Sequence, residues 1–400
     1  MKMIQRPQYL DNLIRFRDKQ LIKVVTGIRR CGKSTLLELY RADLLSRGVR
    51  PRQMIALNLE SGDCLEIETP QRLYEVIAEK LLPNQMNYIF LDEVQRVPGF
   101  QKAVDSLFIK KNCDVYITGS NAALLSGELA TLLTGRYVEI KMLPLSFKEY
   151  CSAFPQDLNR ERLYQDYLYN SSFPYALQLS SPGDRRQYLE SLYDSIVVKD
   201  VIARRRFPDV AMLQSVVRFL FDNIGNVSST KKMADTMTSA GRKISVPTLE
   251  SYLTALTESF VFYQAKRYDI KGKQHLQTGD KYYAADIGLR YCLLGSRAAD
   301  QGHLLENVVY LELLRRGCEV SVGKVGKSEV DFVAVHDEGE EYYQVAWTVV
   351  DTDGQTLRRE LAPLDAIRDH HPKYLLTMDP IPVTSYNGIK QINALDWLLK

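Results

Sequence analysis

The sequence has few cysteines, no excess of charge of one sign and no long apolar run. Its six cysteines are scattered without a Cys-x-x-Cys pair, which argues against a disulfide framework or a structural zinc site. The 52 basic residues nearly balance the 49 acidic ones, so bulk charge favours neither nucleic acid nor a membrane surface as a partner. Because the chain has neither a signal-peptide core after Met1 nor a run of about 18 apolar residues, we expect a cytoplasmic protein.

The remaining composition is that of a soluble globular protein. Apolar residues make up 45% of the chain and charged residues 25%, values typical of globular domains. A length of 400 residues exceeds what one compact core usually holds, so we expect roughly two to four domains.

A phosphate-binding loop is the strongest motif. Residues 27–34 read Gly-Ile-Arg-Arg-Cys-Gly-Lys-Ser and fit the P-loop pattern G-x-x-x-x-G-K-S/T, in which the glycines let backbone N–H groups converge on phosphate oxygens. Lys33 supplies a charge for the β- and γ-phosphates, and the Ser34 hydroxyl binds Mg²⁺. An apolar strand pattern at residues 21–26 precedes the motif and a helical pattern follows it, as the motif requires. The residues expected to bind ATP are Gly27, Arg30, Cys31, Gly32, Lys33, Ser34 and Thr35.

A second motif is a buried strand, expected at residues 88–93, that ends in two acids. Residues 88–93 read Tyr-Ile-Phe-Leu-Asp-Glu, the pattern of a central parallel strand whose carboxyl end delivers charge to a site. We expect Asp92 to orient Mg²⁺ through its water shell, and Glu93 to position and polarise the attacking water. On its own the pattern also fits a strand that ends in a solvated acid, but its position after a P-loop favours ATP hydrolysis.

Two further residues are candidates for the ATPase site, and each also has a structural alternative. The strand at residues 114–118 leads to Asn121, which either senses the γ-phosphate or caps a helix at residues 122–125. Arg136 precedes a strand at residues 137–142. It either neutralises transition-state charge, in its own chain or a neighbour's, or forms a surface ion pair.

The middle of the chain has the element order of a winged helix. Residues 151–210 read as mostly helical, and residues 211–285 as three helices followed by two strands. The strands at residues 260–268 and 281–285 are expected to pair as the wing. The basic residues of this region are Arg242, Lys243, Lys266, Arg267, Lys271 and Lys273. Winged helices bind DNA or mediate protein contacts, and the pattern leaves both open.

Four motifs together resemble a known family. They are the P-loop, Leu-Asp-Glu-Val-Gln at 91–95, Thr-Gly-Ser-Asn at 118–121, and Leu-Pro-Leu-Ser-Phe-Lys-Glu-Tyr at 143–150. The set resembles one group of prokaryotic AAA-type ATPases whose C-terminal domain of unknown function is related to PD-(D/E)xK nucleases. The resemblance covers nearly the whole chain, but it does not supply a cellular role.

The resemblance implies an α/β fold with a P-loop parallel sheet, a helical and winged-helix region, and a small α/β nuclease-like end. The domains expected from it are an ATPase domain at residues 1–155, a helical connector at 156–210, a winged-helix-like domain at 211–285 and a nuclease-like domain at 286–400.

The nuclease-like end has an incomplete site. The family pattern requires an acid on the first helix, an acid on the second strand and Glu-x-Lys on the third, because two acids hold Mg²⁺ and the lysine aligns water. The residues that correspond are Glu306, Asp331 and Gln344. The lysine position holds Ala346, which has no ammonium. We therefore expect binding without DNA cleavage, unless Lys324 or Lys327 replaces the missing lysine.

The sequence therefore predicts an α/β ATPase in which ATP hydrolysis, with Mg²⁺, drives a rearrangement of the C-terminal half. A nucleotide-gated DNA-binding switch and an ATP-regulated nuclease are the alternatives. DNA or a protein is the expected macromolecular partner, and a homo-oligomer is expected if Arg136 acts on a neighbouring chain.

Overall fold

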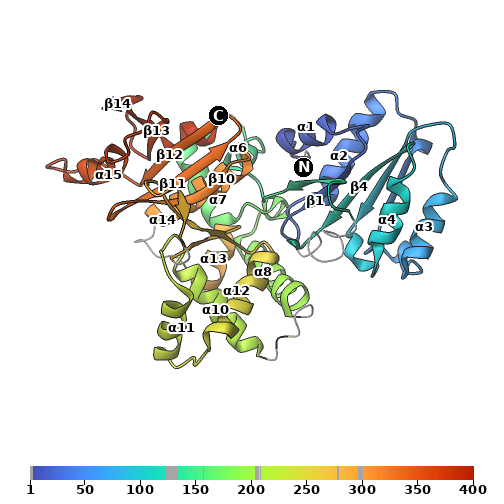
Figure 1. The fold of residues 1–400 in the computed structure, drawn as a ribbon, viewed down its shortest axis with the longest axis horizontal. Helices are drawn as coiled ribbons and strands as arrows, with labels where there is room; N and C mark the ends of the chain where they lie inside the picture. The colour runs from blue at the N-terminus through green and yellow to red at the C-terminus, as the bar shows by residue number, and fades with distance from the viewer. Residues whose placement is uncertain are drawn as a thin grey trace. The chain divides into compact units, whose positions relative to one another are not determined.

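The computed structural model describes residues 3–122, 133–155, 157–202, 207, 209–276, 279–295 and 301–400 (Figure 1). The chain divides into two compact units. The first unit comprises Met1–Pro144 and Glu258–Phe260, and the second comprises Leu145–Thr257 and Val261–Lys400. The α/β fold class predicted from the sequence is confirmed. Among the described helices, none is long and apolar enough to cross a membrane.

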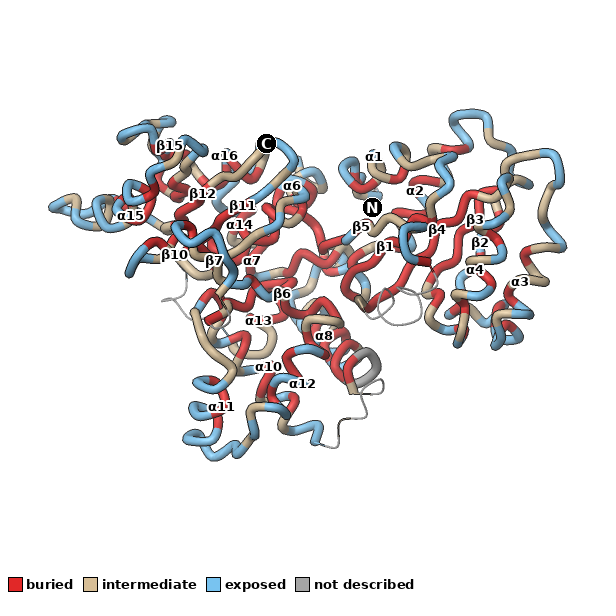
Figure 2. The backbone as a smooth tube through the Cα atoms, in the orientation of Figure 1, coloured by how far each residue is buried: buried red, intermediate tan, exposed pale blue. Residues whose placement is uncertain are grey.

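The first unit is built on a five-stranded parallel sheet with strand order β2-β3-β4-β1-β5. Its strands are β1 (Ile22–Thr26), β2 (Met54–Asn58), β3 (Asn87–Asp92), β4 (Cys113–Gly119) and β5 (Tyr137–Lys141). β1 and β3 are buried along their whole lengths (Figure 2), and their residues are accordingly mostly apolar on both faces. Because β4 lies between β1 and β3, the carboxyl ends of all three strands meet at one edge of the sheet.

Four described α-helices accompany this sheet. They are α1 (Pro7–Arg15), α2 (Lys33–Ser46), α3 (Pro70–Ala78) and α4 (Phe100–Phe108), with short 3-10 helices at Pro51–Gln53, Gly62–Cys64 and Val94–Arg96. Figure 1 shows α3 and α4 side by side, and α1 beside α2. Apolar side chains of the strands and of α3 and α4 form the core, among them Ile22, Ile89, Leu73 and Val104.

A buried ion pair lies at the amino ends of β1 and β4. Lys23 donates to Asp114, and these side chains are 0% and 2% exposed. The Tyr116 hydroxyl donates to the other carboxylate oxygen of Asp114 at 2.7 Å and lies 2.8 Å from the Tyr40 hydroxyl. Burial lowers the pKa of Lys23 and raises the pKa of Asp114, while their mutual attraction opposes both shifts.

Removing one partner of this pair should destabilise the first unit strongly. We expect Asp114→Ala to lower the free energy of unfolding by about 3–5 kcal/mol, because it would leave the amino group of Lys23 buried without its counter-ion. Urea denaturation followed by circular dichroism measures the change. Glu190→Ala is the matched control, since its partner Arg186 is exposed and exposed pairs contribute little. Equal stability of Asp114→Ala and wild type would contradict this account of the pair.

The second unit contains a mixed eight-stranded sheet with order β14-β15-β13-β12-β11-β10-β7-β8. Its strands are β7 (Arg267–Asp269), β8 (Gln274–His275), β10 (Glu319–Val325), β11 (Ser328–His336), β12 (Gly339–Ala346), β13 (Lys373–Thr377), β14 (Thr384–Tyr386) and β15 (Ile389–Asn393). A separate antiparallel pair consists of β6 (Phe262–Ala265) and β9 (Lys281–Ala284).

Helices make up most of the remaining second unit. The described α-helices are α6 (Phe147–Cys151), α7 (Arg160–Asn170), α8 (Pro182–Asp194), α10 (Val210–Asp222), α11 (Thr230–Ser239), α12 (Val246–Glu258), α13 (Ile287–Leu294), α14 (Gln301–Arg315), α15 (Gln355–Asp365) and α16 (Ala394–Leu398). A 3-10 helix spans Pro174–Gln178 and a π-helix spans Ser195–Ile202. The Ser229 hydroxyl accepts a hydrogen bond from the Lys232 N–H and caps α11, as its position before the helix indicates.

The predicted wing is wrong in one respect. The strand expected at residues 260–268 is divided at Lys266 into β6 and β7. Only β6 pairs with β9, whereas β7 pairs in parallel with β10. The Lys266 carbonyl accepts a hydrogen bond from the Val322 N–H at 2.9 Å, so the change of partner begins at that residue. A strand's apolar pattern specifies that it pairs, but not with which partner.

Candidate functional site

The loop between β1 and α2 has the backbone that its glycines predict. Gly27 and Gly32 have φ values of +151° and +106°, and Arg30 lies in the left-handed region at +66°. A Cβ atom on Gly27 would lie 2.1 Å from the carbonyl oxygen of Met142. Only glycine therefore fits at position 27.

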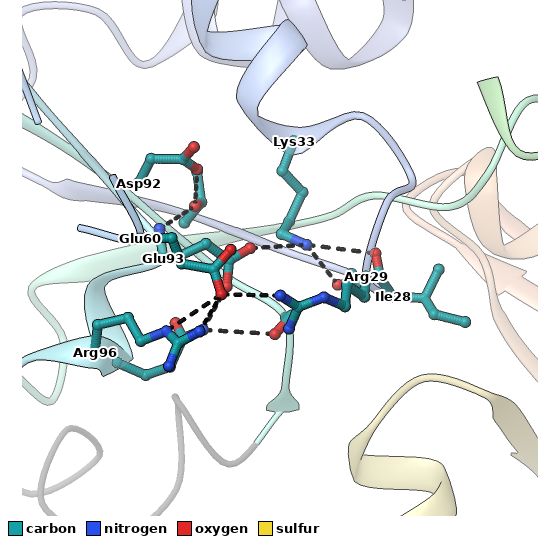
Figure 3. Close-up of polar contacts among 11 residues, drawn as sticks. Ile28, Arg29, Lys33, Glu60, Asp92, Glu93 and Arg96 are labelled. Atoms are coloured by element: carbon teal, nitrogen blue, oxygen red, sulfur yellow. Dashed lines mark hydrogen bonds and ion pairs between the residues drawn. The ribbon is translucent and has the colours of Figure 1, made fainter. Parts of the chain in front are cut away.

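Lys33 folds back over this loop. Its Nζ donates to the carbonyl oxygens of Gly27 at 3.0 Å and Ile28 at 3.3 Å, and lies 3.6 Å from Oε1 of Glu93 (Figure 3). The side chain is buried. The predicted P-loop lysine and the predicted catalytic acid thus lie close together, although Lys33 begins α2 and Glu93 follows β3.

The two acids differ in backbone conformation. Asp92 is the last residue of β3, whereas Glu93 follows it with φ +52° and precedes the 3-10 helix Val94–Arg96. Glu93 is therefore not part of the strand, contrary to the predicted range of 88–93. The Gln95 amide donates to Oε2 of Glu93. A left-handed residue other than glycine is strained, and such strain often occurs at functional sites.

Thr118 on β4 connects both acids, a role that its place in the Thr-Gly-Ser-Asn motif did not predict. Its hydroxyl donates to Oδ1 of Asp92 at 2.5 Å and accepts a hydrogen bond from the Glu93 N–H at 2.9 Å. The side chain is fully buried. A hydroxyl on the neighbouring strand thus fixes the turn at which the acids lie.

Replacing this hydroxyl should slow ATP turnover without abolishing ATP binding. We expect Thr118→Val to lower kcat about tenfold with little change in KM, because a charged hydrogen bond worth roughly 1.5 kcal/mol is lost from the acids but not from the loop. Thr118→Ser should restore most of kcat. Steady-state phosphate release measures both constants, and a Thr118→Val variant with wild-type kcat would contradict this positioning role.

A charged cluster borders the loop. Nη2 of Arg29 lies 2.9 Å and Nη2 of Arg96 lies 2.5 Å from the same oxygen, Oε1, of Glu60 (Figure 3). Burial alone would raise the pKa of Glu60, but the hydrogen bond from Arg96 and the charge of Arg29 hold that pKa below its usual range. Two guanidinium groups thus share one carboxylate oxygen beside the phosphate-binding loop.

Arg6 also supports the loop. Its Nη1 donates to the Cys31 carbonyl at 3.0 Å, and its Nη2 donates to the Leu143 carbonyl at 2.7 Å. The arginine is buried. No nucleotide-binding motif includes this position, so only the structure identifies Arg6 as a support of the loop.

The remaining candidates lie near the edge of the sheet and on the surface. Asn121 is buried just after the end of β4. The alternative helix at residues 122–125 lies largely outside the described residues. Arg136 is 44% exposed, pairs with Asp105 on α4 at 2.5 Å and lies over the Phe108 ring. The surface ion pair, one of the two alternatives for Arg136, is therefore formed in this structure.

The three residues of the predicted nuclease-like site also lie together. Glu306 is on α14, Asp331 on β11 and Gln344 on β12, and the Gln344 Oε1 accepts from the Asp331 N–H at 3.3 Å. The cation among them is Lys281 of β9, whose Nζ lies 2.8 Å from Oε1 of Glu306 and 3.6 Å from Oδ1 of Asp331. Neither of the two lysines proposed as substitutes, Lys324 and Lys327, forms an ion pair with these acids among the described residues.

In this second cluster, burial and neighbouring charge shift the pKa values of Lys281 and Glu306 in opposite directions, and that of Asp331 in the same direction. Burial alone would lower the pKa of Lys281, but the surrounding carboxylates raise it well above its usual range. Burial likewise opposes ionisation of Glu306, yet the Lys281 charge holds the Glu306 pKa below its usual range. For Asp331, burial and the neighbouring Glu306 charge raise the pKa to about 7. In the described part of the chain, no group of three His, Cys, Asp or Glu side chains has the geometry of a metal site.

Comparison with solved structures gives weak overall similarity. The Walker-type ATPase of Pyrococcus abyssi superimposes with a TM-score of 0.49 and 17% identity, covering 73% of this chain and 96% of that chain. The ORC1 protein of Aeropyrum pernix, solved in complex with DNA, gives a TM-score of 0.32 and 12% identity over 73% of this chain and 92% of that one.

Comparison of sequences is more informative. Residues 19–151 match a protein family described as an AAA domain, and residues 161–300 match a domain of unknown function, DUF8612. An uncharacterized protein of Methanocaldococcus jannaschii is 27% identical over 87% of this chain and 79% of its own length. An uncharacterized protein of Haemophilus influenzae is 41% identical over 100% of this chain and 99% of its own length. The chain therefore belongs to the same family as the Haemophilus influenzae protein, and carries an AAA domain followed by a domain of unknown function.

Proposed function

We propose that this protein binds ATP with Mg²⁺ at the loop after β1 and hydrolyses it with the two acids at the carboxyl end of β3, Asp92 and Glu93. The observation that carries the proposal is the convergence of Lys33, Asp92 and Glu93 at one edge of the sheet, with the Lys33 ammonium 3.6 Å from the Glu93 carboxylate. A buried ammonium beside a glycine-rich loop is the arrangement that binds nucleotide phosphates.

The hydrogen bonds of Lys33 are ones that phosphate can replace. Its two hydrogen bonds go to neutral carbonyl oxygens of its own loop, Gly27 and Ile28. A phosphate oxygen carries more negative charge than a carbonyl and accepts a stronger bond from an ammonium. We infer that Lys33 leaves these carbonyls for the β- and γ-phosphates when ATP binds, without a change in the loop's glycine conformations.

Ser34 and Asp92 are suited to hold Mg²⁺ together with the phosphates. Both supply oxygen donors, which Mg²⁺ prefers, and a magnesium ion in such sites keeps most of its waters. Thr118 occupies Oδ1 of Asp92, and none of the described residues donates to Oδ2, which is therefore available to a metal-bound water. When bound, Mg²⁺ neutralises charge that develops on the phosphates during hydrolysis.

Glu93 is placed to act on the attacking water. In the proposed reaction, water attacks the γ-phosphorus, the bond from phosphorus to the ADP oxygen breaks, and the water proton passes to the Glu93 carboxylate. Gln95 donates to one oxygen of that carboxylate, which fixes its orientation. Asn121 is proposed to hydrogen-bond the γ-phosphate from the end of β4.

Arg136 is proposed to act on the site of a neighbouring protomer. Its ion pair with Asp105 is exposed, so exchanging this partner for a phosphate costs little. We expect activity per subunit to rise with protein concentration, and mixing Arg136→Ala with Lys33→Ala subunits to restore activity, because mixed interfaces combine an intact loop with an intact arginine. Phosphate release from the mixture measures this. A concentration-independent rate without rescue on mixing would contradict action between protomers.

We propose the four-part domain division given above, in which α10, α11, α12, β6 and β9 form the winged-helix-like part. ATP hydrolysis is proposed to drive a rearrangement of the C-terminal half. Arg242 and Lys243, between α11 and α12, are exposed, which supports a role in contacting an acidic partner such as DNA.

Phosphate release tests the proposed function directly. ATPase activity should require Mg²⁺ and disappear in EDTA. If the protein uses ATP hydrolysis to act on DNA, duplex DNA should raise the ATPase rate. A slow rate that DNA does not change would favour the nucleotide-gated switch. Absence of any Mg²⁺-dependent ATP hydrolysis, with and without DNA, would refute the proposal. Size-exclusion mass measured in the same samples reports the oligomeric state.

A further inference from the structure

We propose that the Lys281 ammonium is the resident cation of an acidic cluster formed by Glu306, Glu329 and Asp331, and that this cluster therefore binds no divalent metal ion. The inference concerns the second unit alone and does not depend on ATP hydrolysis. It accounts for a nuclease-like arrangement of acids in which the lysine comes from β9 and not from β12, the strand that carries Gln344. The ammonium of this lysine lies where a metal ion would otherwise bind.

The position of the ammonium carries the inference. Nζ of Lys281 lies 2.8 Å from Glu306, 2.8 Å from Glu329 and 3.6 Å from Asp331, and its side chain is 4% exposed. Mg²⁺ binds carboxylate oxygens at about 2.0–2.1 Å. A metal ion cannot reach that distance from these carboxylates while an ammonium lies among them, because both the volume and the positive charge of Lys281 exclude it.

The acids of the cluster and Gln344 also have other hydrogen-bond partners. The Tyr283 hydroxyl donates to Oε1 of Glu306 at 2.6 Å, and the Val345 N–H donates to Oδ2 of Asp331 at 2.9 Å. The Gln344 carbonyl accepts from the Asp331 N–H, while its amide donates to Glu360 at 3.0 Å. The residues predicted as metal ligands thus already have partners within the protein, and they do not fit a bound Mg²⁺.

Lys281 and Tyr283, which both contact the cluster, lie on the same strand, β9. Lys281 and Tyr283 are two residues apart on β9, so their side chains point to the same side of the strand. Both contact Glu306 of α14. The single ammonium faces three carboxylates, so removing it would leave a strongly negative pocket that attracts a divalent cation.

Manganese binding by the wild-type protein tests the proposal first. Mn²⁺ titration followed by electron paramagnetic resonance, at pH 8 and without nucleotide, should give the same number of bound ions for wild type and Asp331→Asn. The comparison isolates the cluster because both proteins have the same P-loop. A bound Mn²⁺ in wild type that is lost in Asp331→Asn would overturn the proposal, as would metal-dependent nicking of plasmid DNA that is lost in the same variant.

Removing the ammonium supplies the converse test. Lys281→Met should have a lower melting temperature than wild type, and Mn²⁺ should raise it again while one additional ion binds. That ion should be lost in the double variant Lys281→Met/Asp331→Asn, and Lys324→Met should behave as wild type. A folded Lys281→Met that binds no additional Mn²⁺ would contradict the proposal. If Lys281→Met does not fold, the wild-type comparison with Asp331→Asn decides.

Discussion

Lys33→Ala is expected to weaken ATP binding by roughly a hundredfold or more. The lysine is buried, and its ammonium lies over the loop within hydrogen-bond distance of the Gly27 and Ile28 carbonyls. Its loss removes two charged hydrogen bonds to phosphate, each worth about 1.5–3 kcal/mol, and every 1.4 kcal/mol corresponds to about tenfold in affinity.

Fluorescence anisotropy of a labelled ATP analogue measures this effect. Lys102→Ala is the matched control, because Lys102 is an exposed lysine on α4 of the same unit. The Lys33→Ala protein should retain the circular dichroism spectrum of wild type, so that loss of binding is not loss of folding. Wild-type affinity in Lys33→Ala would show that the nucleotide binds elsewhere.

Glu93→Gln is expected to keep ATP bound and to lower turnover by roughly a hundredfold or more. A glutamine has nearly the same shape as a glutamate, and the Glu93 N–H would still donate to Thr118. The neutral amide cannot accept the proton of the attacking water, a contribution worth about 10²–10⁴-fold in rate.

Turnover and affinity have to be measured on the same preparation. The expected pattern is a fall in kcat with little change in the affinity for the ATP analogue. Glu75→Gln, which changes an exposed acid on α3, should leave both unchanged. If Glu93→Gln hydrolysed ATP at the wild-type rate, another group would have to activate the water.

The parts of the site that lie within one short segment were predictable from the sequence. The strand, loop and helix around Lys33 follow from a local pattern of apolar residues and glycines. Asp92 was placed correctly at the end of β3, because a continuous apolar run indicates a buried parallel strand. The turn that takes Glu93 out of the strand was not predicted, since φ +52° is unusual for a glutamate.

The parts that depend on contacts between distant segments were not predictable. Thr118 reads as an ordinary strand residue until β4 is placed beside β3. Lys281 is 25 residues from Glu306 in sequence, and it reaches the acids because β9 lies next to α14. A single sequence specifies that a strand or an acid is present, but strand order and pairing partner decide which side chains meet.

A crystal structure with Mg²⁺ and a non-hydrolysable ATP analogue tests the central claim most directly. We predict the β- and γ-phosphates in the loop between β1 and α2, with Lys33 bonded to them instead of to the Gly27 and Ile28 carbonyls. The metal should lie between Ser34 and the water shell of Asp92, and a water should lie between Glu93 and the γ-phosphate. A nucleotide bound elsewhere, or Lys33 still bonded to its own loop beneath bound phosphates, would contradict the account.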